Sequence, residues 1–141
     1  MSSEDDNIIV NLGLVINSKN QVLMIKRREK ETGRSGVVLE WSFPGGKQEA
    51  SESGSESLVK KILAKTGYQV EVLKKISSRP HPQFSVQADY YLCRLSSEEK
   101  GEMTSEAEKV AAIRWVTPSE VVNLITVDLD LEVFQELSKL V

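Results

Sequence analysis

The sequence predicts a single α/β domain, on the basis of three observations. Apolar, β-rich runs alternate with amphipathic segments that have the period of a helix. No segment is repeated along the chain, and no linker divides it. A length of 141 residues fits one domain that buries its own core. We assign the acidic residues 1–7 to a flexible N-terminus and residues 8–141 to the domain.

The first part of the domain is predicted to contain a β-hairpin and a third extended segment. Residues 8–16 and 22–26 are apolar, and the polar turn residues 17–20 separate them, which is typical of a hairpin. Residues 29–36 are polar and include two glycines, so they are predicted to form a loop. Residues 37–43 are then predicted to be extended.

Residues 53–66 are predicted to form a helix. Ser53 and Glu56 have the spacing of a capping box at its start, and Gly67 stands where a helix usually ends in a left-handed cap. The helical period divides its side chains into two arcs. We expect a buried stripe of Leu58, Val59, Ile62 and Leu63, and an exposed arc of Lys60, Lys61, Ala64 and Lys65.

Three further strands and two helices are predicted in the second half of the chain. Residues 70–76, 84–95 and 110–116 are rich in apolar and β-forming residues, which predicts strands. Pro118 is suited to the first turn of a helix, where its missing N–H breaks no hydrogen bond. Residues 129–140 carry apolar side chains at helical spacing and are predicted to form the last helix.

The composition argues against several classes of function. The net charge of −3 argues against nucleic-acid binding, which normally needs a basic surface. One cysteine cannot form an internal disulfide, and one cysteine with one histidine does not make a structural zinc site. No apolar run is long enough to span a bilayer, and no signal-peptide pattern opens the chain. We therefore expect a cytoplasmic protein that does not bind membranes.

Residues 41–68 carry a recognisable motif. The segment starts Trp41-Ser42-Phe43-Pro44-Gly45-Gly46, and Glu52, Ile62 and Gly67 follow at set spacings. It resembles the signature of the Nudix (MutT-like) family, G-x5-E-x7-R-E-U-x-E-E-x-G-U, in which U is aliphatic. The resemblance implies a Nudix-type α/β/α sandwich with a mixed central sheet. It also implies that Glu52 and Gly67 are structural, and that Lys60 replaces the arginine with which the family glutamate pairs.

The glutamates that hold metal in family enzymes are missing from the motif, so the Nudix box is degenerate. Their three positions are taken by Lys61, Ala64 and Lys65. Nudix enzymes use Mg²⁺ or Mn²⁺ to hydrolyse a nucleoside diphosphate linked to another moiety, and such cations need oxygen ligands. Replacing three glutamates by two lysines and an alanine changes the formal charge from −3 to +2. We therefore expect no metal at these positions and identify no firm catalytic residue.

Two functions stay open, and the sequence favours the first. The first is a non-hydrolytic or strongly impaired module that needs no cofactor and binds a nucleoside diphosphate derivative or a protein partner. The second is a Nudix pyrophosphohydrolase that requires Mg²⁺ or Mn²⁺ and uses relocated carboxylates. Glu106 and Glu108 are its candidates, because family enzymes often take a ligand or general base from that loop, whereas we expect Glu49 not to reach the helix face. A purely structural subunit and a homodimer also stay open.

Candidate ligand contacts flank the motif. By the resemblance, Arg27 faces the ligand cleft and the loop of Gly45 and Gly46 borders the phosphates. Arg79 and His81 are placed in one turn, where they would contact a phosphate or a base. The simpler interpretation of His81 is a satisfied surface residue.

Lys61 and Lys65 are a second candidate pair. They are four residues apart, so they share one face of the helix, and that face borders the glycine loop. Ammonium groups bind phosphate as point charges. We therefore predict that the two lysines hold phosphate directly, without a metal. Solvated surface lysines are the alternative.

Overall fold

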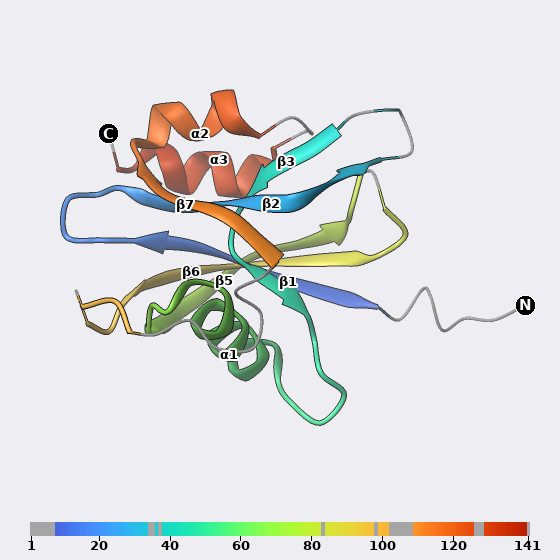
Figure 1. Ribbon diagram of the computed structural model, residues 1–141, viewed down its shortest axis with the longest axis horizontal. Coiled ribbons are helices and arrows are strands. Elements are labelled where there is room, and N and C mark those ends of the chain that lie inside the picture. Colours follow the sequence, from blue (N-terminus) through green and yellow to red (C-terminus); the bar gives the residue numbers. More distant parts are fainter. Residues whose placement is uncertain are drawn as a thin grey trace, which may run out of the picture.

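A computed structural model describes residues 8–33, 36, 38–82, 84–97, 99–101, 109–125 and 129–140. The predicted α/β/α fold is confirmed: a mixed sheet lies between α1 on one side and α2 and α3 on the other (Figure 1). Within the described residues, no helix is both long and apolar enough to cross a membrane. The strands are β1 Ile9–Ile16, β2 Val22–Thr32, β3 Val38–Ser42, β4 Gly45–Lys47, β5 Val70–Pro80, β6 Gln87–Leu95 and β7 Val110–Val116, and the helices are α1 Gly54–Thr66, α2 Pro118–Leu124 and α3 Leu131–Ser138.

The sheet is mixed because β1 pairs with neighbours of both directions. The strand order is β3-β2-β1-β6-β5, while β4 pairs with β1 and β7 pairs with β2. β1 runs parallel to β6 and antiparallel to β2 and β4. The short strand β4 meets the first half of β1, where Leu12 is opposite Gly45 and Asn11 is opposite Gly46. The structure therefore places Gly45 and Gly46, which were expected in a loop, in a strand beside β1, and the name glycine loop refers below to these two residues of β4.

Three strand boundaries differ from the prediction, and one strand was not predicted. β2 continues to Thr32 through the first part of the predicted loop, because β3 pairs with it there. β4 was not predicted, since three residues carry no periodic pattern, and it depends on pairing with β1. β5 extends to Pro80, which places Arg79 in a strand and not in a turn, and β6 begins at Gln87 and not at residue 84.

Two hydrophobic cores lie on opposite faces of the sheet. Leu14 of β1 packs with Val121 of α2 and with Val133 of α3. Its neighbour Val15 points to the other face and packs with Ile62 of α1. The alternation along β1 therefore serves both cores, as expected for a strand at the middle of a sheet.

Helix α1 begins and ends where the sequence predicts. Glu56 N donates to Ser53 Oγ at 3.2 Å and Ser53 N donates to Glu56 Oε1 at 3.1 Å, so the capping box is complete. Gly67 ends the helix with φ +81°, the left-handed conformation that favours glycine. Of the predicted stripe, Leu58 and Ile62 are fully buried, and Val59 and Leu63 are half-buried. Ala64, expected on the exposed arc, is buried as well.

Candidate functional site

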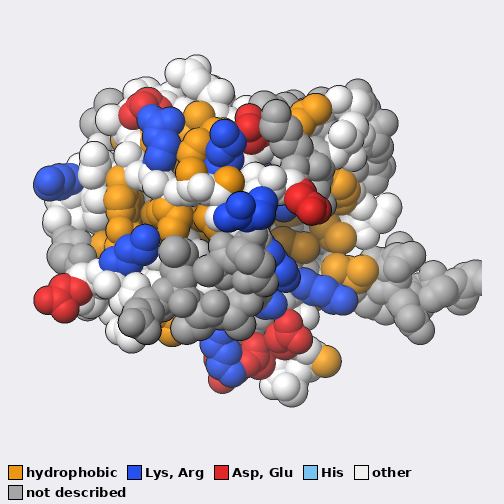
Figure 2. Space-filling model, in the orientation of Figure 1, with side chains coloured by type: hydrophobic (Ala, Val, Ile, Leu, Met, Phe, Trp, Pro, Cys, Tyr) orange, Lys and Arg blue, Asp and Glu red, His pale blue; other side chains and the backbone are white. Residues whose placement is uncertain are grey.

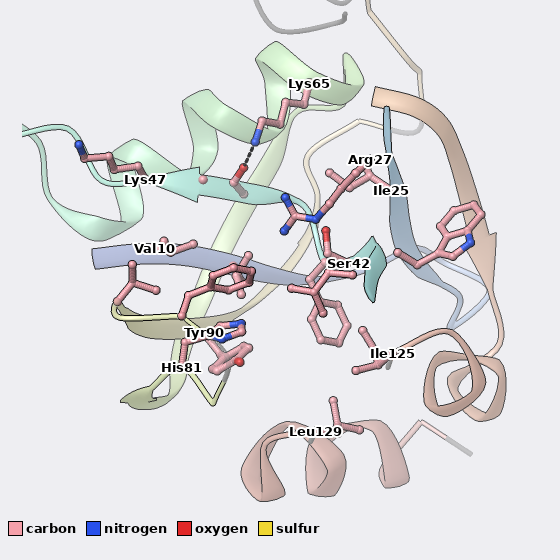
Figure 3. Close-up of a pocket in the computed structure, with 18 of the residues that line it drawn as sticks. Val10, Ile25, Arg27, Ser42, Lys47, Lys65, His81, Tyr90, Ile125 and Leu129 are labelled. Carbon is pink, nitrogen blue, oxygen red and sulfur yellow. Dashed lines mark hydrogen bonds between the residues drawn. The ribbon is translucent and has the colours of Figure 1, made fainter. Parts of the chain in front are cut away.

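A cavity of about 390 Å³ opens beside the glycine loop (Figure 3). Small-molecule sites usually have volumes of roughly 300–1,000 Å³. Strands β1 to β4 form much of its wall, and Ile125 and Leu129 close one side from the connection between α2 and α3. Its lining is largely apolar and aromatic, and it includes Val10, Leu12, Ile25, Leu39, Trp41, Phe43, Phe84, Val86 and Tyr90.

The charged side chains that the structure shows lining this cavity are all basic. They are Arg27, Lys47, Lys65 and Arg79. Arg27 points from β2 and Lys65 points from α1 toward the same end of the cavity, whereas Lys47 extends away from both (Figure 3). An apolar hollow with basic side chains fits a ligand that has a flat apolar part and an anionic part.

Lys61 and Lys65 lie against the glycine loop. Lys65 Nζ donates to the carbonyl oxygen of Gly45 at 2.6 Å. A Cβ built on Gly46 would lie 3.3 Å from Lys65 Nζ and 3.2 Å from Lys61 Cδ. The prediction that both lysines are exposed is wrong, since both are half-buried. The reason is that β4 covers this arc of the helix, and the aliphatic parts of the lysines pack across the glycines.

Glu49 reaches the helix face, contrary to the prediction. Its Oε2 atom lies 3.2 Å from Lys61 Nζ. The backbone explains the reach, because Glu49 N donates to the Oγ of Ser57 in α1 at 3.3 Å, and Ser57 is only 1% exposed. The loop between β4 and α1 is therefore fixed to the helix at this residue, and its carboxylate neutralises Lys61.

A second ion pair braces the same loop. Lys60 Nζ donates to Glu52 Oε2, so Lys60 supplies the positive partner expected at the arginine position. This hydrogen bond raises the pKa of Lys60 above its ordinary value. Gln48 Nε2 donates to the carbonyl oxygen of Glu52 at 3.1 Å, and Asn11 Nδ2 donates to Gln48 Oε1 at 3.3 Å. Asn11 was not predicted as a site residue, although a polar residue inside the apolar run 8–16 was a signal for it.

Arg79 is held in the cavity wall by two partners. Its Nε lies 3.6 Å from Oδ2 of Asp130, which is 6% exposed and caps α3, and its Nη2 lies 3.4 Å from the hydroxyl of Tyr90. Burial raises the pKa of Tyr90, although the bond from Arg79 offsets part of the effect. His81 also lines the cavity, with its ring centre 5.2 Å from that of Phe84. Asp130 was not predicted as a site residue, and its only signal in the sequence is its position before the last helical pattern.

The described residues at the box do not fit a divalent metal. The three family positions present two ammonium groups and a methyl group, none of which coordinates Mg²⁺ or Mn²⁺. The nearby carboxylates of Glu49 and Glu52 are each paired with a lysine. Across the part of the chain that the structure describes, no three His, Cys, Asp or Glu side chains are grouped as metal ligands. Glu106 and Glu108 lie outside that part.

The fold is that of a hydrolase-like α/β/α domain of the Nudix type. The sequence matches the NUDIX domain over residues 9–137, and the chain belongs to this family. It is 28% identical over 105 residues to a protein of Bacillus subtilis (strain 168) named "Putative 8-oxo-dGTP diphosphatase", covering 74% of this chain and 63% of that protein.

Solved structures share the fold. The MutT protein from Methanosarcina mazei Go1 superposes with a TM-score of 0.68 at 17% identity, and the alignment covers 94% of each chain. A NUDIX hydrolase from Nitrosomonas europaea gives a TM-score of 0.71 at 17% identity, covering 94% of this chain and 71% of that one. At these identities the likeness is one of fold.

Proposed function

We propose that this protein is a non-hydrolytic Nudix module that binds a nucleotide by direct contact between its phosphate and basic side chains, without a metal ion. The observation that carries the proposal is the position of Lys65. Its ammonium group lines the cavity next to the Gly45 carbonyl, at a position where family enzymes have a metal-binding glutamate.

The remaining lining suits the rest of a nucleotide. Trp41, Phe84 and Tyr90 offer aromatic faces or edges to a base. Arg27 and Arg79 supply guanidinium groups, which hydrogen-bond phosphate and carbonyl oxygens. No carboxylate is among the described residues that line the cavity, so an anion inside it would meet only basic charged side chains.

Hydrolysis is disfavoured by the same charges. Two unit charges about 4 Å apart interact by about 4 kcal/mol at an effective dielectric of 20. An ammonium at that distance would therefore oppose a divalent cation by several kcal/mol. Without a bound cation, water keeps its high pKa and the phosphate charge is not offset by a metal.

A metal-dependent hydrolase is the second candidate. The observation that favours it is the name of the Bacillus subtilis relative, which describes a diphosphatase. In this case Glu106 and Glu108 would have to supply the metal ligands or the general base.

Calorimetric titration in EDTA distinguishes the two functions. GMP, GDP and ADP-ribose are titrated into the protein. We expect at least one of them to bind without Mg²⁺. Lys65→Met, which keeps the aliphatic chain but removes the charge, should weaken that binding by roughly 10- to 150-fold, because bonds to charged groups contribute roughly 1.5–3 kcal/mol. Lys139→Met removes a lysine that is 67% exposed and pairs with Glu136, and should leave affinity unchanged.

Hydrolysis assays complete the test. We expect no Mg²⁺-dependent turnover of dinucleotide polyphosphates, ADP-ribose, NADH or nucleoside triphosphates. Binding that requires Mg²⁺, together with turnover that disappears in a Glu106→Ala/Glu108→Ala variant, would contradict the proposal and establish the hydrolase.

A further inference from the structure

Glu49 occupies a position that a ligand phosphate would compete for. We propose that Glu49 is a specificity-determining residue that disfavours a second phosphate at Lys61, so that the site selects ligands with one phosphate; this role rests on the proposed function. The proposal concerns the ion pair of Glu49 and Lys61, which the sequence did not predict.

The two lysines are arranged in order from the cavity outward. Lys65 lines the cavity, whereas Lys61 is not among its lining residues. Lys61 lies one helical turn away from Lys65, on the same face of α1. Gly46 lies beside both lysines, since a Cβ atom built on it would contact Lys65 Nζ and Lys61 Cδ. A phosphate on a ligand in the cavity therefore meets Lys65 first, and a second phosphate continues over Gly46 toward Lys61.

The carboxylate at Lys61 is held by the backbone of its own loop. Glu49 N donates to Ser57 Oγ, and Glu52 N donates to the Glu49 carbonyl oxygen at 3.2 Å. Acidic and basic side chains lie side by side at the lower end of the molecule in Figure 2, where Figure 1 shows the loop between β4 and α1. These two hydrogen bonds fix the main chain at Glu49, which places its carboxylate within reach of Lys61.

Because the Glu49 and Lys61 side chains are partly exposed to solvent, the competition between the Glu49 carboxylate and a phosphate for Lys61 should be moderate. The Glu49 side chain is 57% exposed and the Lys61 side chain is 20% exposed. A second phosphate would have to replace the carboxylate at Lys61 or lie beside it, and the two anions repel each other. Exposed ion pairs contribute roughly 0.2–1 kcal/mol, which corresponds to at most about a fivefold change in affinity.

The experiment compares ligands that differ by one phosphate. Inorganic phosphate, pyrophosphate, GMP and GDP are titrated calorimetrically in EDTA against the unmodified protein and Glu49→Gln. Glutamine keeps the size of the side chain and the backbone hydrogen bonds. We expect Glu49→Gln to strengthen binding of pyrophosphate and GDP by up to about fivefold and to change binding of phosphate and GMP by less than about twofold.

Two further variants show whether the effect belongs to the ion pair. Glu71→Gln removes one negative charge from a different exposed pair, with Arg94, and should change neither class of ligand. Lys61→Met combined with Glu49→Gln should abolish the gain for GDP, because the ammonium group that the second phosphate would contact is then missing.

The outcomes separate the two proposals. If none of the four ligands binds in EDTA and ADP-ribose does not bind either, the proposed function fails, and the role of Glu49 fails with it. If ADP-ribose alone binds, the proposed function stands and the role of Glu49 is wrong, because a ligand with two phosphates is then preferred. If they bind and weaken with Lys65→Met, but Glu49→Gln shifts mono- and diphosphates equally or not at all, only the role of Glu49 is wrong. A selective gain for diphosphates that Lys61→Met removes supports both.

Discussion

Gly45→Ala should strongly destabilise the protein, whereas Gly46→Ala should not. Gly45 has φ +153°, a conformation that side chains rarely adopt. A Cβ on Gly45 would lie 1.9 Å from the carbonyl oxygen of Asn11 and 3.0 Å from the Cα of Leu12. Both atoms belong to the backbone of β1, which is fixed by pairing with β6 as well as β4. The clash can be relieved only by separating β4 from β1.

The magnitude follows from two contributions. Holding a residue other than glycine in this region of φ and ψ costs about 1–3 kcal/mol. Overpacking against a rigid neighbour costs a further 1–3 kcal/mol or so. Together they predict a loss of roughly 2–6 kcal/mol, a large part of the typical 5–15 kcal/mol of a folded domain. At Gly46 the nearest atoms belong to the side chains of Lys61 and Lys65, which can move, so the loss should stay below about 1 kcal/mol.

Urea unfolding followed by tryptophan fluorescence measures both variants, since Trp41 and Trp115 lie on β3 and β7. Equal midpoints and equal m-values for Gly45→Ala and Gly46→Ala would refute the reasoning, because the close contact with β1 would then be absent. An unfolded Gly45→Ala beside a folded Gly46→Ala would agree with it.

Two other predictions concern the core. Leu58→Ala should lower the free energy of unfolding by about 2–5 kcal/mol, because Leu58 is fully buried. Leu131→Ala, at a residue that is 67% exposed, should lower it by about 0.5 kcal/mol or less. Similar losses for the two variants in urea unfolding would contradict the assigned core. Burial raises the pKa of Cys93 from 9.0 to about 12, so the native thiol should not react with a disulfide reagent at pH 8. Raising the pH above 9 should lower the free energy of unfolding, because the thiolate forms more readily in the unfolded chain. Rapid labelling of the native protein at pH 8 would show that Cys93 is accessible.

The features that could be predicted were those that depend on neighbours in sequence. The capping box of Ser53 and Glu56, the left-handed end at Gly67 and the burial of Leu58 and Ile62 all follow from spacing along one helix. The extension of β2 and the existence of β4 could not be predicted, because partner strands stabilise these polar or very short segments. Pairing between distant segments leaves little trace in local composition.

The candidate site divides in the same way. The motif placed Lys61 and Lys65 beside Gly45 and Gly46, and the structure brings them together. Their partial burial could not be predicted, because periodicity separates the two sides of a helix but does not say that a short strand covers the polar side. The reach of Glu49 was missed for a related reason: it depends on a hydrogen bond to Ser57, which the sequence does not reveal.

The three lysines of α1 hold the segment between Gly45 and Glu52 in place without a metal ion. Lys60 pairs with Glu52, Lys61 pairs with Glu49, and Lys65 donates to the Gly45 carbonyl. Each contact joins the helix to a different point between β4 and the start of α1, so the chain that follows the glycines is tied to the helix by side chains of the protein itself. The cavity next to this loop can therefore keep its shape without a cation, and binding and hydrolysis become separable properties. These contacts agree with the metal-free site that we propose, because they hold the chain beside the cavity through side chains of the protein alone.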